Sequence, residues 1–344
     1  GASCDGAMGF RAGCSCAGWA LLLLLVPPAA AIVRRRARPE PKPDFAACDT
    51  PQGCGDGSIP QWQIRDLLGR VGERAREVAT TGRTPLILHI GADELGNDAL
   101  WSDVHLYREV LSRLPKLPGS FRLVFVEPME CKVPRIRSNL ARLDTRGADP
   151  RIVTTAVDKA CAADAVTFYT VSRRARSDLS VPMNVVGGWS SLSRDRLLGA
   201  VKGAAHAFCT EPCTELCQNR CPWMRALNGS IADYIEPKRV PCLTTSQLLA
   251  EVGADASDLA MLVVDAEGAD IKIVSSFLGQ PGFRPGFLQW EAMWNRAPQI
   301  VPAIHEAGFL VGRFYADEMT GSDSDNMFAV PVTAGEEGSR ACLS

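Results

Sequence analysis

Short runs of continuous apolar residues, separated by stretches with helical spacing, constrain the fold of this chain more than any other feature of its sequence. Strands that are apolar on both faces have to be covered on both faces, which crossover helices achieve in parallel sheets. Repetition of such units predicts a doubly wound α/β fold with a mostly parallel sheet. The predicted strands occupy residues 86–90, 123–126, 152–156, 261–264 and 287–290.

Two more apolar runs, at residues 309–314 and 327–330, close the series. The segment between them has no room for a long crossover helix, and antiparallel strands need only a short connection. These runs therefore predict an antiparallel hairpin at the edge of the sheet.

The composition divides the chain into several parts. Residues 1–44 combine a leucine-rich apolar run, a cluster of arginines and a proline-rich stretch, which is typical of a signal peptide or membrane anchor followed by a linker. Residues 45–335 form the predicted α/β domain, with a cysteine-rich insertion near residues 195–242, and residues 336–344 form a tail. Together with a glycosylation sequon at Asn228, the N-terminal segment favours the secretory pathway, with the protein anchored in the membrane, lumenal or secreted.

The overall charge is close to balance, with 37 Lys and Arg residues against 39 Asp and Glu residues. A protein that binds nucleic acid needs a basic patch or stripe. The basic runs of this chain lie near its N-terminus rather than across the domain, so nucleic acid is not expected as a partner.

Cysteines are numerous, 13 in all, and four of them follow one another closely in the insertion. Zinc sites usually take cysteine pairs from separate turns, so this run is only a partial match to a metal site. Disulfides within the insertion, or with Cys242, are the favoured interpretation, and no metal site is predicted. The four are Cys209, Cys213, Cys217 and Cys221.

Glycine and acidic residues follow the first two predicted strands. Gly91, Ala92 and Asp93 follow the first, and a glycine there lets a ligand approach the backbone closely. Glu127 ends the second, where a carboxylate can accept hydrogen bonds from both hydroxyls of a ribose. Each feature alone also suits a plain strand-to-helix turn. Together, in this order, they predict a nucleoside-binding site.

The fourth predicted strand ends in Asp265-Ala266-Glu267-Gly268, which places two carboxylates at the ligand-binding edge of the sheet. Either carboxylate could act as a general base. The alternative is that Asp265 and Glu267 hold the loop by accepting hydrogen bonds from backbone N–H groups.

Taken together, these motifs resemble the FkbM family of methyltransferases, over about residues 85–331. The resemblance implies a Rossmann-like class I methyltransferase fold with a seven-stranded sheet, and S-adenosylmethionine as cofactor. It also implies an acceptor that is a small molecule or glycan, with O-methylation of a sugar, lipid or small metabolite. The segments that carry it are Gly91-Ala92-Asp93, Glu127-Pro128, Leu243-Thr244-Thr245, Leu248-Leu249, Val264-Asp265-Ala266-Glu267-Gly268-Ala269 and Gln289-Trp290-Glu291.

The same resemblance assigns roles to individual residues. Glu127 would hold the ribose, and Asp265 and Glu267 would face the transferred methyl group and the acceptor. His89 stands where the family usually has an acid that orients the cofactor's amino group. The other residues expected to line the cofactor are Gly91, Ala92 and Asp93 on the methionine side, and Ala156 and Val157 near the adenine.

Two other classes of protein share parts of this pattern. In a membrane-anchored glycosyltransferase, Asp265-Ala266-Glu267 would be a metal-binding acidic motif. A non-catalytic binding domain would have kept the fold and lost the chemistry, because a neutral His89 cannot replace the charge of a carboxylate.

Overall fold

The computed structural model describes residues 58–59, 67–93, 95, 103–114, 120–159, 161, 164–179, 181, 185–186, 189–210, 231–266, 268–291, 297–314 and 326–332. The predictions for residues 1–44, for Glu267 and for residues 336–344 lie outside this set. So do those for the insertion cysteines, since of these only the backbone of Cys209 is described. Among the helices of the described residues, none has the length and apolar character needed to cross a membrane.

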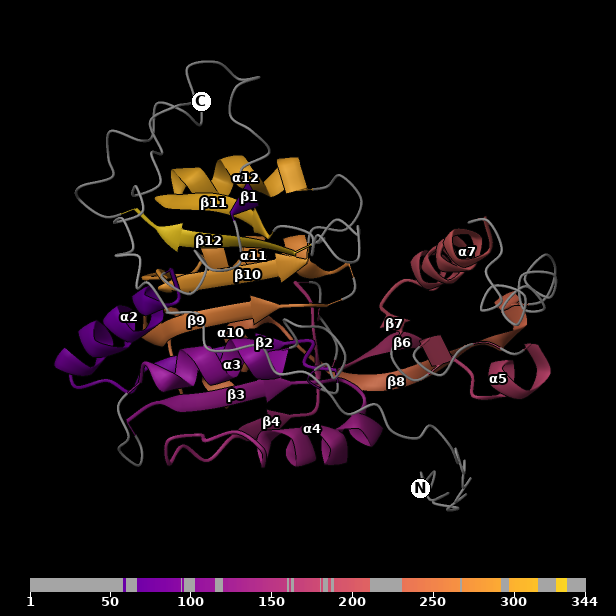
Figure 1. The fold of residues 1–344 in the computed structure, drawn as a ribbon, viewed down its shortest axis with the longest axis horizontal. Coiled ribbons are helices and arrows are strands. Elements are labelled where there is room, and N and C mark those ends of the chain that lie inside the picture. The colour runs from indigo at the N-terminus through magenta and orange to yellow at the C-terminus, as the bar shows by residue number, and fades with distance from the viewer. Residues whose placement is uncertain are drawn as a thin grey trace, which may run out of the picture.

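The main sheet has eight strands in the order β1-β11-β12-β10-β9-β2-β3-β4 (Figure 1). Every pairing is parallel except those of β12, which runs antiparallel to both of its neighbours. In the order of the sheet, the strands are Ser58–Ile59, Phe309–Phe314, Asn326–Pro331, Phe287–Glu291, Leu259–Val264, Leu86–Ile90, Arg122–Val126 and Arg151–Val153.

This arrangement confirms the predicted α/β class and the mostly parallel sheet. Strands β11 and β12 form an antiparallel hairpin at this end of the sheet, as predicted, with β12 on the inner side next to β10. Four consecutive residues of β12, from Met327 to Val330, are buried, which an interior strand requires and an edge strand does not. The two-residue strand β1 takes the outer place beside β11.

Helices cover both faces of the main sheet. On one face α2 (Gly69–Thr80), α3 (Asp103–Ser112) and α4 (Val133–Leu140) pack against strand residues such as Ile87 and Phe125. On the other, α10 (Thr245–Glu251), α11 (Asp270–Leu278) and α12 (Ala297–Glu306) pack against residues such as Leu88 and Val124. Neighbouring residues of one strand thus pack into opposite layers of the core. This explains why the strands are continuous apolar runs in the sequence.

The threonine-leucine motif before the fourth predicted strand is a helix start. Thr244 caps α10 in a capping box: its hydroxyl accepts a hydrogen bond from the backbone N–H of Gln247 at 3.2 Å. The side-chain oxygen of Gln247 accepts in return from the backbone N–H of Thr244 at 2.8 Å. Leu248 and Leu249 then bury their side chains against the sheet. The Thr244 and Leu248-Leu249 motif therefore starts a helix and packs it on the sheet.

A second sheet of four strands, in the order β5-β8-β6-β7, lies beyond the carboxyl ends of the main strands (Figure 1). Its strands are β5 (Ala156–Val157), β8 (Ile235–Leu243), β6 (Ala165–Val171) and β7 (Ser190–Ser191). The predicted third strand is therefore split between the two sheets, because the chain crosses over after β4. The second sheet also begins well before residue 195, where the insertion was expected to start.

A disulfide joins Cys161 to Cys242, whose Cα atoms lie 5.6 Å apart. Cys242 was expected to pair with a cysteine of the insertion, but its partner precedes β6. The bridge fixes the segment after β5 to the end of β8. It packs with Ala156 and Phe168 in a small apolar cluster of the second sheet.

Replacing both cysteines, Cys161→Ser with Cys242→Ser, is expected to lower the free energy of unfolding by about 2–4 kcal/mol, since the bridge closes a long loop in the unfolded chain. Urea denaturation of the full chain without reductant measures this loss. Cys131→Ser, at an exposed cysteine outside this bridge, is the matched control and should keep the wild-type stability. Equal stability of variant and oxidised wild type would contradict the prediction.

Candidate functional site

The strand order reverses next to β2, which makes the gap between β2 and β9 a topological switch point. From β2 the chain moves one way to β3 and β4, and then back to β9 and β10 on the other side. Open α/β sheets bind ligands outside the carboxyl ends of the strands at such points. A cavity of about 270 Å³, here called the first cavity, lies at this position. Its lining includes Gly91, Asp93, Glu127, Lys132 and Asp265.

Gly91 shapes the turn after β2 and has a backbone conformation that favours glycine, with φ at +82°. A Cβ atom at this position would lie 1.7 Å from the carbonyl oxygen of Asp265. The backbone N–H groups of Gly91 and Ala92 both donate to the carbonyl of Val126, at 2.9 and 3.0 Å. The turn thus joins the ends of β2, β3 and β9, so the fold itself requires this glycine.

Glu127 directly follows β3, and its side chain is held in place by hydrogen bonds from backbone N–H groups. One carboxylate oxygen accepts from the N–H of Asp93 at 2.9 Å, and the other from the N–H of Met129 at 2.8 Å. The residue is only 3% exposed, yet it lines the first cavity. Burial raises the pKa of Glu127 to about 7, against the opposing effect of the Lys132 ammonium. Each oxygen keeps a lone pair for a ligand.

The raised pKa of Glu127 predicts how stability depends on pH. Its pKa is about 7 in the folded protein, against an ordinary 4.5, so between these values the folded state binds more protons than the unfolded state. The contribution of Glu127 to the free energy of unfolding, measured as the difference between wild type and Glu127→Gln, should therefore fall as the pH rises from about 4.5 through about 7. In Glu127→Gln, which carries no charge, this contribution disappears.

Urea denaturation of the full chain across pH 5 to 8 measures the effect. The exposed Glu130, three residues along, provides the control variant Glu130→Gln, which should keep the wild-type pH dependence. A Glu127→Gln protein with the wild-type slope would show that the folded-state pKa is not raised.

Lys132 is a cavity residue that the sequence-based prediction did not include. It ends the short 3-10 helix Glu130–Lys132, is buried, and forms an ion pair with Asp93. Asp93 itself stays about half exposed, at 47% of its side chain. A lysine six residues after a strand cannot be distinguished from a surface lysine in the sequence. Only the turn at Pro128 brings it back over the cavity.

The structure brings most of the predicted site residues together. Gly91, Asp93, Glu127 and Asp265 line the first cavity, as do Ala156 and Val157 of β5. Ala92 is fully buried and packs into the core behind the turn.

His89 requires a correction, because it does not line the cavity. Side chains alternate along β2, so His89 shares the face of Ile87 and is fully buried. Its ring lies 5.8 Å from that of Tyr107 and 6.1 Å from that of Phe125, measured between centroids. Burial lowers the pKa of His89 to about 3, which keeps the ring neutral in the core.

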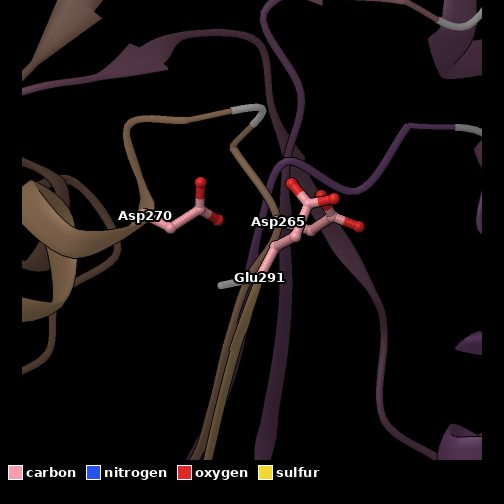
Figure 2. Close-up of side chains that lie close together, drawn as sticks. All are labelled: Asp265, Asp270 and Glu291. Atoms are coloured by element: carbon pink, nitrogen blue, oxygen red, sulfur yellow. The ribbon is translucent and has the colours of Figure 1, made fainter. Parts of the chain in front are cut away.

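Three carboxylates, those of Asp265, Asp270 and Glu291, meet beside the first cavity (Figure 2). One oxygen of each lies within 4.8 Å of the others, which is close enough to share a divalent cation. They come from different segments: Asp265 follows β9, Asp270 begins α11, and Glu291 ends β10.

Asp270 has the loop-holding role considered for Asp265 and Glu267. It is 2% exposed, and its two oxygens accept from the backbone N–H groups of Ala266 at 2.9 Å and Gly268 at 2.8 Å. Burial raises the pKa of Asp270, while these hydrogen bonds oppose the shift. The loop after β9 therefore closes on a buried side chain of the following helix.

A second cavity of about 450 Å³ adjoins the first and shares Trp189 and Ser190 with it. Glu291 at the end of β10 and Asp270 at the start of α11 line it. Helix α7 (Arg194–Thr210), which follows β7, lines it from the opposite side with Arg196, Leu197, Gly199 and Ala200. The guanidinium group of Arg196 donates to the carbonyl of Gly268, which ties α7 to the loop after β9.

Comparison with known proteins finds no matching family model, no matching curated protein and no matching solved structure.

Proposed function

We propose that the chain is an S-adenosylmethionine-dependent methyltransferase that methylates an oxygen of a sugar, lipid or small metabolite. The observation that carries the proposal is Glu127: a carboxylate that is almost fully buried, directly follows a central strand and still lines a cavity at the switch point. A carboxylate whose pKa is strongly shifted by burial, in a cavity, is characteristic of a functional site. The mostly parallel sheet, with β12 as the antiparallel strand, is compatible with the class I methyltransferase fold that the FkbM resemblance implies.

The lining of the first cavity fits the parts of this cofactor. Glu127 offers acceptors to the two ribose hydroxyls. Ala156 and Val157 offer an apolar wall to the adenine. The Asp93–Lys132 ion pair presents both charges that the zwitterionic amino-acid end needs.

When bound, the cofactor supplies a methyl group that is already activated on a sulfonium. The residues of this chain then have to place that methyl group in line with the acceptor oxygen and exclude water. Asp265 lines the first cavity from the end of β9, on the side where the second cavity begins.

Isothermal titration of the full chain with S-adenosylmethionine, and with S-adenosylhomocysteine, tests the proposal. Micromolar binding is expected, and Glu127→Ala should weaken it roughly 100-fold, because two hydrogen bonds to a charged group are lost. The control Glu130→Ala changes an exposed acid of the same segment and should bind as wild type. No heat with either ligand, from folded wild-type protein, would refute the proposal.

A glycosyltransferase that depends on a divalent cation is the second candidate, favoured by the carboxylates of Asp265, Asp270 and Glu291. It differs from the acidic motif predicted from sequence, because Asp270 and Glu291 join Asp265. Titration with Mn²⁺ alone distinguishes the two. Binding that is lost in Asp265→Asn, together with turnover of a nucleotide sugar, would favour this candidate.

We also propose that the domain works in an oxidising compartment, because a disulfide such as Cys161–Cys242 forms and persists there. Attachment to a membrane through residues 1–44 stays a prediction.

A further inference from the structure

The second cavity lies where a reaction partner of a ligand in the first cavity would have to sit. The two cavities share the wall formed by Trp189 and Ser190. Asp265 faces the first cavity and Glu291 the second, and their carboxylates belong to one cluster with oxygens within 4.8 Å (Figure 2). Two separate ligands, one in each cavity, would therefore meet beside these carboxylates.

Glu291 is the carboxylate of this cluster that is placed to act on a ligand in the second cavity. Asp270 lines the same cavity, but both of its oxygens accept from backbone N–H groups, and its role is to hold the loop. Glu291 ends β10 and is partly exposed, at the junction of the two cavities. A carboxylate in that place can accept the proton of a hydroxyl group.

The rest of the lining indicates the chemistry of the ligand. Trp189 offers a large apolar surface with a polar edge, and Leu197, Ala200 and Ile271 extend the apolar wall. The hydroxyls of Ser190 and Ser191 and the amide of Gln299 add neutral hydrogen-bonding groups. This mixture suits a ring that is apolar on its C–H face and carries hydroxyls around its rim.

The charges at the end of the second cavity nearest the first cavity argue against an anionic group at that end. The lining also carries two cations: Arg196, which donates to the carbonyl of Gly268 and keeps its charge, and the exposed Lys272. Asp270 and Glu291 make the end beside the first cavity acidic. A phosphate or carboxylate placed there would be repelled.

We propose that the second cavity binds the acceptor, a neutral carbohydrate, and that Glu291 accepts the proton of its reacting hydroxyl. The proposal rests on the proposed methyltransferase function. The acceptor oxygen forms a bond to the methyl carbon while the carbon–sulfur bond breaks and its electron pair goes to sulfur. The products are the methyl ether and S-adenosylhomocysteine, and the hydroxyl proton moves to Glu291.

Ligand binding to the full chain tests the cavity independently of turnover. The probes are the methyl α-glycosides of glucose, galactose and mannose. Saturation-transfer NMR detects their binding to the protein, with and without S-adenosylhomocysteine. Ala200→Trp fills the second cavity and should abolish the glycoside signal, while S-adenosylmethionine binding stays within about threefold of wild type. Lys202→Trp places the same side chain on the exposed side of α7 and should behave as wild type.

Glu291→Gln tests the proton transfer. It should keep glycoside binding and cofactor binding but reduce methyl transfer to the bound glycoside by roughly 10²–10⁴-fold, the usual contribution of a general base.

The outcomes separate the two proposals. If wild-type protein binds no S-adenosylmethionine, the proposed function fails, whatever the glycosides do. If it binds the cofactor but shows no glycoside signal, or a signal that Ala200→Trp leaves intact, the acceptor assignment fails alone. Spermidine is measured in the same NMR experiment. Binding of spermidine without binding of the glycosides would identify a cationic acceptor and refute the proposal of a carbohydrate acceptor.

Discussion

Gly91→Ala is expected to lower the free energy of unfolding by about 2–5 kcal/mol and to abolish ligand binding in the first cavity. Two costs combine. An alanine in the left-handed region costs about 1–2 kcal/mol, and the new methyl group would lie 1.7 Å from the carbonyl oxygen of Asp265 and 2.5 Å from its carbon. Both contacts are to backbone, so the ends of β2 and β9 must move apart.

Gly82 provides a matched control for this substitution. Its φ is +75°, close to that of Gly91, but a Cβ atom there meets nothing within 4 Å. Gly82→Ala should therefore show the conformational cost alone, about 1–2 kcal/mol, and leave ligand binding unchanged. Urea denaturation of the three proteins measures both costs. Equal losses of unfolding free energy in the two variants would show that the close contact with Asp265 adds no cost.

Asp270→Ala is expected to lower the free energy of unfolding by about 3–5 kcal/mol. The substitution leaves the part-buried backbone N–H groups of Ala266 and Gly268 without their acceptor, and an N–H without a partner costs about 1–3 kcal/mol when buried. The loop after β9 would then lose its fixed shape, and both cavities would lose a wall.

Asp270→Asn is a milder substitution to compare with Asp270→Ala, because the amide keeps one acceptor oxygen and loses the other. Its stability should fall between those of wild type and Asp270→Ala in the same denaturation experiment. Hydrogen exchange by NMR should show faster exchange at Gly268 in both variants. An Asp270→Ala protein with wild-type stability and wild-type exchange at Gly268 would show that the loop is held by other contacts.

The main sheet was predictable from sequence because its strands are buried on both faces. Strands β2, β3, β9 and β10 all appear as continuous apolar runs, and helix packing on both sides accounts for this pattern. The antiparallel pairing of β11 and β12 was predictable from the short connection. The strand β1 outside this hairpin was not predictable, because its two residues are too few for a periodic pattern.

The second sheet gave weaker sequence signals. Strand β8 contains Pro237 and Pro241 and exposes four consecutive residues, which disfavours a strand on local grounds. It forms because β6 pairs with it along its length, through contacts between segments some 70 positions apart in the chain. Strands β5 and β7 have two residues each, which is too short for a periodic pattern.

The same difference explains which parts of the site were predicted. Gly91, Glu127 and Asp265 follow recognisable strands, and the carboxyl ends of parallel strands meet at one edge. Trp189 reaches that edge through the second sheet, so its place depends on a fold that the sequence did not reveal. His89 shows the reverse case: a residue one position from the strand end points into the opposite layer of the core.

Trp189 and Ser190 line both cavities, so a ligand in either cavity contacts the same two residues. A ligand that repositions the indole on one side changes the shape offered to a ligand on the other. Thermodynamic linkage then requires the effect to be mutual: the factor by which the first ligand alters the affinity for the second equals the factor in the reverse direction. The two affinities are in that case coupled through a single side chain, and Trp189→Phe would change both of them together.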